Sequence, residues 1–362
     1  MESIASDLNH TLPRRDWRGF VRMDTHCHSH ASSKPYNTLA GLIDCPECYS
    51  PPEKVYDQAI ARGMDLVTIS DHDTIAGALE LAERGFERFI IGEEVSVQFP
   101  EDRCMVHVLV WAISPEQHEQ IATLGLRNDV YRFAHWLCEQ NLPHAFAHPL
   151  YAQNGKLTRW HVERAALLFK GFEVRNGAHA DVQNRAIERF VDTLSPGLIH
   201  RLVDEHGIEP LWPRIWEKAR TGGSDDHGLL NTGRTWTGVP IAPKESIDDP
   251  HEFFRRVMQT RSIVGGVGGH SALLAHQLAT VGAHYYARRL HEQRSPSGRY
   301  LGSRLLRFAG VRASTPGKLR LAAYKTTRRL WKPRTARALP IVRALKANIG
   351  PLLDKYPELR TR

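Results

Sequence analysis

A single unit recurs between Met23 and His227: a short apolar run, then polar residues at its carboxyl end, then a helical pattern. Strand–helix alternation of this kind favours parallel strands in an α/β fold. Seven such units are present, and seven could close into a barrel. The strands are predicted at residues 19–25, 65–70, 89–97, 104–113, 143–147, 171–175 and 221–224.

Amphipathic patterns between and after these runs predict helices. Ser114 is a candidate N-cap for a long pattern that Gly125 can interrupt. The segment 198–220 contains Pro210 and Pro213 and is predicted to be an excursion before the seventh strand. Helices are predicted at 52–62, 74–84, 115–140, 158–169, 181–194 and 250–261, and an eighth strand at 234–239.

Histidines and acids gather where the predicted strands end. His26 and His28 follow the first strand, and positions two apart on a strand face the same side. In a parallel barrel the carboxyl ends of the strands meet at one mouth, where active sites are found. A lone histidine after a strand is more often a hydrogen-bonded loop residue, but placement at successive strand ends favours a shared site. The candidate metal ligands are His26, His28, His72, Glu94, His107, His148, Asp225 and His227.

These six imidazoles and two carboxylates suit a cluster of divalent ions better than a single structural zinc, which four ligands usually close. Neutral imidazole is the commonest protein ligand for such metals. Zn, Mn and Fe all suit a site rich in histidine.

The order of the motifs between residues 26 and 227, H-x-H, S-D-H-D, G-x-E, V-H-V, A-H-P and S-D-x-H, resembles the polymerase and histidinol phosphatase (PHP) domain family. The resemblance covers about residues 20–239. It implies a distorted seven-stranded (β/α) barrel whose two or three metal ions hydrolyse phosphoesters. It also implies that His26, His28, Glu94 and Asp225 hold one ion, that Glu94, His107 and His148 hold a second, and that His72 and His227 are ligands of a third.

The chain departs from the family at one position. Members usually place an Asp or His seven or eight residues after the first histidine of H-x-H, whereas this chain has Ser33 and Lys34 there. A charged ammonium group cannot ligate a metal. We expect Lys34 either to supply positive charge near the phosphate where the third ion would lie, or to point to solvent from a loop.

The expected mechanism follows from a two-ion site. Such ions lower the pKa of a bridging water, and the resulting hydroxide attacks phosphorus in line. Arg175, Lys34 and His179 are candidate cations for the phosphate, and Asp71 and Asp73 are expected to orient His72. The predicted catalytic residues are therefore Lys34, Asp73 and Arg175.

The leading prediction is a metal-dependent phosphoesterase acting on a small phosphorylated substrate. The alternative is a nuclease or phosphodiesterase whose nucleic acid is held by a basic tail. Metal-dependent C–N hydrolysis usually uses a lysine ligand, and no lysine ends the third or fourth strand. A barrel that only binds is disfavoured by the nearly complete ligand set.

Positive charge is concentrated at the carboxyl end of the chain. Residues 301–362 hold 16 Lys and Arg against two acidic residues, whereas the first 300 residues hold 32 against 38. The tail could bind an anionic membrane surface or nucleic acid, or be a solvated extension. The domains are predicted as a barrel over 1–240, its helical completion over 241–290, and a basic, partly helical or disordered extension over 291–362.

Two further features bear on the compartment. Residues 1–18 contain no apolar stretch typical of a secretory signal, and five cysteines in a long chain suggest a reducing compartment. We therefore expect a cytoplasmic protein, with peripheral membrane attachment as an option for the tail. The pair Cys45 and Cys48 is interpreted as part of an ordinary loop, because no second pair follows it.

Overall fold

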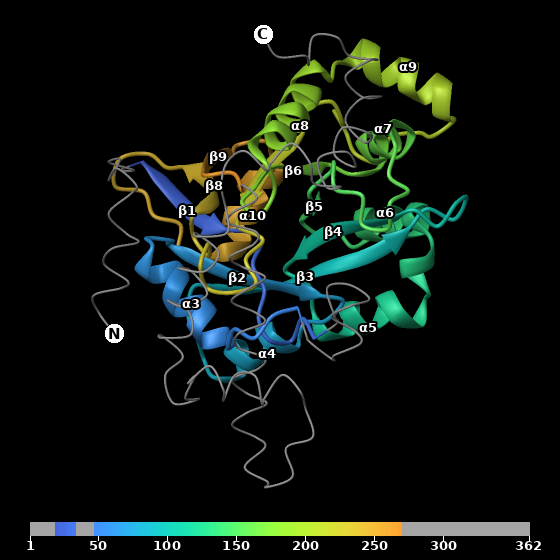
Figure 1. The fold of residues 1–362 in the computed structure, drawn as a ribbon. Coiled ribbons are helices and arrows are strands. Elements are labelled where there is room, and N and C mark those ends of the chain that lie inside the picture. Colours follow the sequence, from blue (N-terminus) through green and yellow to red (C-terminus); the bar gives the residue numbers. More distant parts are fainter. Residues whose placement is uncertain (1–18, 34–46, 270–362) are drawn as a thin grey trace, which may run out of the picture.

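The computed structural model describes residues 19–33 and 47–269, which form a nine-stranded sheet flanked by helices (Figure 1). The strand order is β7-β6-β5-β4-β3-β2-β1-β8-β9. The strands are β1 (Phe20–Asp24), β2 (Leu66–His72), β3 (Phe89–Gln98), β4 (Met105–Trp111), β5 (His144–Phe146), β6 (Gly171–Asn176), β7 (Ala219–Gly223), β8 (Thr235–Pro240) and β9 (Ile263–Gly266). The mixed α/β class and all eight predicted strands are confirmed, and β9 was not predicted.

One strand runs against the predicted direction. β1, β2 and β3 are mutually parallel, as are β5, β6 and β7, but β4 is antiparallel to both of its neighbours. The expectation of parallel strands throughout was therefore wrong for β4. Because β4 is reversed, the start of this strand lies beside the end of β3, where His107 pairs with Ser96.

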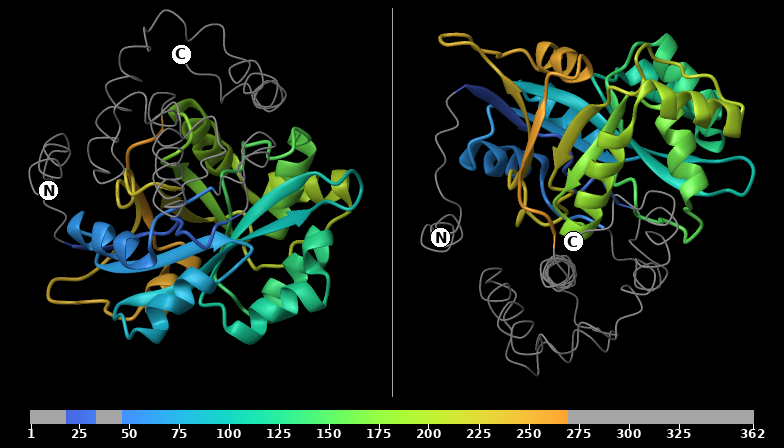
Figure 2. Two further views of the ribbon diagram at one scale, coloured as in Figure 1. Left: turned by 60° about the horizontal axis from the view of Figure 1, so that its bottom comes forward. Right: turned by 90° about the horizontal axis from the view of Figure 1, so that it is seen from above.

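The sheet is nearly closed, but it has nine strands instead of the expected seven. β8 pairs with β1 over residues 20–23, so β7 meets the first strand only beyond Thr25. There Asp225 N donates to His26 O at 2.7 Å, and Cys27 bridges Asp226 in the parallel sense. β9 extends the edge beyond β8 and lies close to β7 (Figure 2).

The helices lie outside the sheet, with α3 and α4 against β2 and with α8 against β6. Gly125 separates α5 from η1 in a left-handed conformation (φ 65°), and the Ser114 side chain caps α5, as the sequence predicted. A further helix, α9, begins at Pro196 and extends into the segment 198–220 that was predicted to be an excursion. The helices are α3 (Pro52–Ala61), α4 (Ala76–Glu83), α5 (Pro115–Thr123), η1 (Leu126–Asn128), α6 (Val130–Glu139), α7 (Arg159–Leu168), α8 (Asp181–Thr193), α9 (Pro196–His206) and α10 (Pro250–Met258).

Apolar side chains fill the barrel at the end opposite the predicted site. Val21, Leu66 and Ile90, near the starts of three parallel strands, belong to one buried cluster with Phe253 and Phe254 of α10. The Phe254 ring stacks on Trp111, with 4.5 Å between centroids. This packing closes one end of the barrel and leaves the carboxyl ends of the parallel strands to carry polar groups.

After β8 the chain forms α10 and then β9, which pairs with β8. The predicted division into domains stays a prediction. Residues 270–362, which include the predicted basic tail, lie outside the described residues, as does Lys34. Within the described part of the chain, no helix has the length and apolar character needed to cross a membrane.

Candidate metal centre

Glu94 lies at the middle of a buried group of histidines. Its Oε2 atom is 3.0 Å from His26 Nε2, 3.3 Å from His28 Nε2 and 3.1 Å from His72 Nδ1. Its Oε1 atom is 2.8 Å from both His107 Nδ1 and His148 Nε2. The two oxygens of one carboxylate therefore face different sets of imidazoles.

Asp225 brings a second carboxylate to the first set. Its Oδ1 atom is 3.6 Å from His26 Nε2 and 3.4 Å from His28 Nε2. Two ligands of one ion, each about 2.1 Å from it, lie roughly 3.0–3.4 Å apart. Three of the four separations between these imidazoles and carboxylates lie in this range and the fourth is 3.6 Å, so the four side chains are spaced much as ligands of a single ion are.

Two observations test whether a metal fits here. His28 Nε2 is buried without a hydrogen-bond partner among the described residues, although it faces two carboxylates. A buried nitrogen of this kind needs an explanation, and a ligand lone pair directed at an ion provides one. His26, Glu94 and His148 form a further group whose ligand atoms all lie within 4.8 Å of one another. The donor set around Glu94 therefore fits divalent metal binding.

Neighbouring side chains set which nitrogen of each histidine is available. Glu173 Oε1 lies 2.9 Å from His26 Nδ1 and, as a carboxylate oxygen, accepts a hydrogen bond from the Nδ1–H group. Ser32 Oγ lies 3.2 Å from His28 Nδ1 and itself donates to Asp71 at 2.8 Å. Both contacts leave Nε2 deprotonated in the neutral ring, as a metal ligand requires.

The same charges perturb the titration of the site. Burial opposes charge on His26 and His28, but the surrounding carboxylates outweigh it; they raise the pKa of His26 and raise the pKa of His28 to about 9. Burial also opposes charge on Glu94 and Asp225, yet the imidazoles hold the pKa of both carboxyl groups well below the usual range. Without an ion, protonated imidazoles at His26 and His28 therefore offset the negative charge of Glu94 and Asp225.

Glu47 is a member of this site that the sequence analysis missed. Its Oε2 atom lies 3.4 Å from His72 Nε2, and its Oε1 atom lies 3.6 Å from His227 Nε2. Burial raises the pKa of this carboxyl group to about 8. The residue lies inside the Cys45–Cys48 pair, and a lone glutamate in a loop gave no signal in the sequence. Cys45 itself is outside the described residues.

The structure places the predicted catalytic residues Asp73 and Arg175 away from the histidines. Asp73 Oδ1 accepts from Ser96 N at 2.8 Å and lies 3.2 Å from Arg127 Nε. Arg175 donates to Gly266 O at 3.2 Å and lies 3.9 Å from Glu188, because an irregularity in β6 after Glu173 turns its side chain outward. These contacts favour structural roles for both residues. The role predicted for Lys34 stays a prediction.

His179 lies at the edge of the centre, with Nε2 3.8 Å from Asp225 Oδ2 and its ring centroid 4.7 Å from that of Tyr151. Burial, with His148 nearby, lowers the pKa of His179 to about 4. The imidazole is therefore neutral at physiological pH, and the structure does not support its predicted role as a cation.

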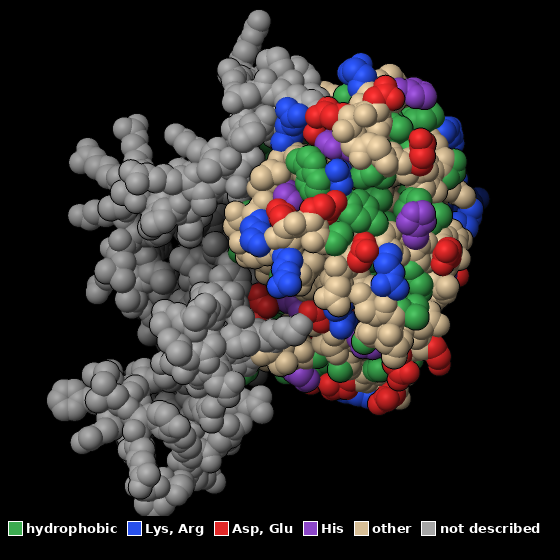
Figure 3. Space-filling view, turned by 90° about the vertical axis from the view of Figure 1, so that its right-hand side faces the viewer, with side chains coloured by type: hydrophobic (Ala, Val, Ile, Leu, Met, Phe, Trp, Pro, Cys, Tyr) green, Lys and Arg blue, Asp and Glu red, His purple; other side chains and the backbone are tan. Residues whose placement is uncertain are grey.

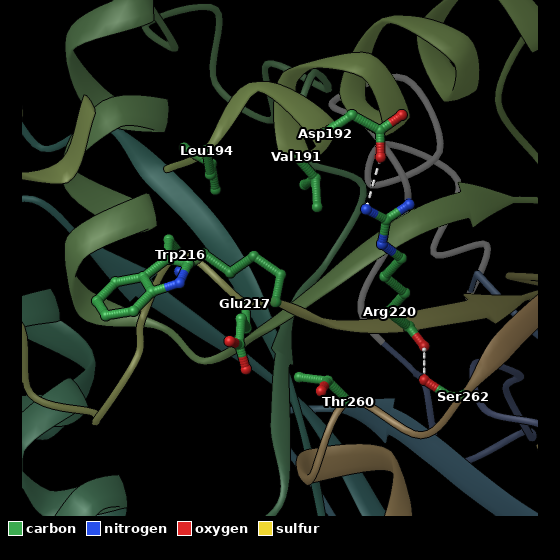
Figure 4. A pocket seen from close by; sticks show the side chains of 9 residues that line it. Val191, Asp192, Leu194, Trp216, Glu217, Arg220, Thr260 and Ser262 are labelled. Atoms are coloured by element: carbon green, nitrogen blue, oxygen red, sulfur yellow. Dashed lines mark hydrogen bonds and ion pairs between the residues drawn. The ribbon is translucent and has the colours of Figure 1, made fainter. Parts of the chain in front are cut away.

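A cavity of about 330 Å³ lies elsewhere, at the start of β7, at the end of this strand away from Asp225 (Figure 4). Asp192 and Arg220 line it and pair with each other at 2.6 Å, and Ser262 donates to Arg220 O at 2.8 Å. These polar groups satisfy one another, so the concentration of ligand-type side chains marks the functional site better than the size of this cavity does.

Comparisons with known proteins leave the family open. No protein-family model matches the sequence, and no curated protein matches it either. Among solved structures, an amidohydrolase from Chromobacterium violaceum with bound sulfate and no metal is 18% identical, with a TM-score of 0.38, over 67% of this chain and 97% of that one. PsfC from Pseudomonas syringae is 13% identical, with a TM-score of 0.38, over 74% of this chain and 98% of that one.

A proposed metal-dependent phosphoesterase from Bifidobacterium adolescentis is 15% identical, with a TM-score of 0.35, over 66% of this chain and 96% of that one. Similarity at this level establishes neither an activity nor a substrate. The resemblance to the PHP domain family therefore stays a prediction, and the functional argument depends on the geometry of the site.

Proposed function

We propose that this protein is a metal-dependent phosphoesterase acting on a small phosphorylated substrate. The observation that carries the proposal is the placement of Glu94, whose two oxygens face His26 and His28 on one side and His107 and His148 on the other. A carboxylate in this position suits a bridge between two ions. Paired divalent ions supply an activated water and stabilise the charge that develops on a phosphoryl group.

The chain's own residues prepare the site for this chemistry. Glu94 and Asp225 are deprotonated at neutral pH, and they offset the positive charge of bound ions. Glu173 and Ser32 hold two imidazoles in the orientation that presents Nε2. The apolar packing around Phe254 fills the other end of the barrel, so the polar groups of the centre lie toward the carboxyl ends of the parallel strands.

His179 and Tyr151 lie beside His148, with ring centroids 5.4 Å and 5.6 Å from that of His148. They line a small cavity together with His148, Asn176 and Gln183. A neutral imidazole and a phenol can donate hydrogen bonds to a phosphate ester or its leaving group. These groups support a small substrate better than a polymer.

Surface charge agrees with this preference on one face. Acidic and basic side chains are interspersed on the face shown in Figure 3, which lacks the single-sign stripe typical of nucleic-acid binding among its described residues. Binding of nucleic acid or of a membrane surface through residues 301–362 stays a prediction, as does a cytoplasmic location.

The test uses the full chain loaded with Mn²⁺ or Zn²⁺ and three substrates: a phosphomonoester, a phosphodiester and a single-stranded oligonucleotide. Hydrolysis of a small ester is expected, together with its loss in Asp225→Asn. Asp192→Asn, which changes an acid at the opposite end of β7, is expected to keep wild-type activity. Cleavage of the oligonucleotide alone would favour the nuclease alternative, and hydrolysis of none of the three substrates would refute phosphoester chemistry.

A further inference from the structure

Glu47 places a carboxylate beside His72 and His227, the two histidines predicted as ligands of a third ion. The chain has Ser33 and Lys34 where a third-ion ligand was expected, and neither provides an anion. In the structure, the two oxygens of Glu47 lie 3.4 Å from His72 Nε2 and 3.6 Å from His227 Nε2. These separations resemble the spacing of ligands around one ion, roughly 3.0–3.4 Å, more closely than they resemble short hydrogen bonds.

The imidazoles are arranged so that the nitrogens facing Glu47 are the ones able to bind. His227 Nδ1 donates to Asp225 O at 3.2 Å, which leaves Nε2 as the acceptor in the neutral ring. His72 Nδ1 faces Glu94, so its Nε2 is the atom turned toward Glu47. His28, His72 and His227 also form a group whose ligand atoms lie within 4.8 Å of one another.

Backbone contacts hold Glu47 in this place. Cys48 N donates to Ser32 O at 3.4 Å, and His30 N donates to Ser50 O at 2.8 Å. The Cys48 thiol contacts His28 O at 3.5 Å. The chain directly after Glu47 is thus bound, at Cys48 and Ser50, to the loop that carries the first two histidines, and these contacts help to position the carboxylate.

We propose that Glu47 completes a third cation site with His72 and His227, and so replaces the acid or imidazole that the chain lacks at Ser33 and Lys34. The proposal deepens the proposed function and rests on it, because the third ion would share the centre with the first two. A divalent ion here would lie beside the pair bridged by Glu94 and could bind a further oxygen of a phosphate group.

Metal content tests this proposal without an activity assay. Wild type, Glu47→Gln and Glu83→Gln are equilibrated with buffered Mn²⁺, and the bound metal per chain is measured by mass spectrometry. Glu83 is an exposed acid at the end of α4 and serves as the matched control. We expect three equivalents in wild type and in Glu83→Gln, and two in Glu47→Gln.

The affinity for the third ion should fall by more than about 100-fold in Glu47→Gln, because partners outside the ligand shell are themselves worth 10–100-fold. Retention of the first two ions shows that this variant is folded. Glu47→Asp keeps the charge but moves the carboxylate back by one methylene group, and it is expected to lower the affinity for the third ion only. Two equivalents in wild type, or three in Glu47→Gln, would overturn the proposal.

The outcomes separate this proposal from the proposed function. An active phosphoesterase that binds only two ions would remove the role of Glu47 and leave the function intact. Three ions bound by a protein that hydrolyses no phosphoester would support the role of Glu47 and refute the proposed function.

Discussion

Glu173 provides a sharp test of how the centre is built. This fully buried acid makes three hydrogen bonds: Oε1 with His26 Nδ1 at 2.9 Å, and Oε2 with His148 N at 2.7 Å and with Asn176 Nδ2 at 2.9 Å. All three partners donate. Replacement by Gln keeps the shape of the side chain but offers only one acceptor oxygen, so the three donors cannot all be satisfied.

Two orientations are open to the new amide in Glu173→Gln. If its oxygen faces His148 N and Asn176, its NH₂ group faces His26 Nδ1. The imidazole must then carry its proton on Nε2, the atom that faces Glu94. If the amide is reversed, His26 is held correctly, but two buried donors lose their acceptor. In either orientation, the free energy of metal binding becomes less favourable by the loss of about one or two hydrogen bonds.

Each lost bond to a charged group is worth roughly 1.5–3 kcal/mol. At about 1.4 kcal/mol per factor of ten, the loss of one such bond predicts an affinity for metal that is about 10- to 100-fold weaker, which is the size known for such supporting residues, and the loss of two predicts a larger decrease. The affinity can be measured by competition with a chromophoric chelator. Glu163→Gln is the matched control, because Glu163 is another buried acid paired with a histidine, His206, in the contact between α7 and α9.

Glu163→Gln is expected to lower thermal stability without changing the affinity of the centre around Glu94 for metal. If Glu173→Gln bound metal as tightly as wild type, or lost only stability, the assignment of His26 Nε2 as a ligand would be refuted.

Three further predictions follow from the same geometry. Glu94→Gln should lose both bridged ions and all metal-dependent activity, and metal analysis that still finds two equivalents would contradict the bridge. The affinity for metal should rise as pH increases from 6 to 9, because below its pKa of about 9 His28 holds a proton that an ion must displace. Isothermal titration calorimetry in buffers of different ionisation heat would detect the released proton. An affinity that does not change with pH would count against His28 as a ligand. Phe254→Ala should destabilise the protein by about 3–5 kcal/mol, because it removes a buried ring stacked on Trp111; chemical denaturation measures this, and a loss below about 1 kcal/mol would mean that α10 does not close the barrel.

Most of the fold could be predicted from the sequence because each strand is a separate apolar run bounded by polar residues. The direction of β4 could not be predicted, since side-chain alternation is the same in parallel and antiparallel strands. The predicted site did not depend on this direction. Because β4 is reversed, His107 near its start lies beside the carboxyl end of β3, on the side of the sheet where the other candidate ligands lie. β9 was missed because its short, glycine-containing run has no alternating pattern.

The supporting residues were harder to predict than the candidate ligands. Glu173 was visible at a strand end, but its two-sided contact with His26 and His148 depends on how β5 and β6 pack. Glu47 depends on the return of the chain to the loop at Ser32, a contact that no local pattern encodes. Arg175 was misplaced because the sequence gave no sign of the irregularity in β6.

The most direct measurement is anomalous diffraction from crystals of the full chain grown with Mn²⁺. It should show two peaks within coordination distance of Glu94, one beside Oε2 with His26 and His28 and one beside Oε1 with His107 and His148. Peaks that avoid Glu94, or a single ion bound by surface acids, would contradict the account.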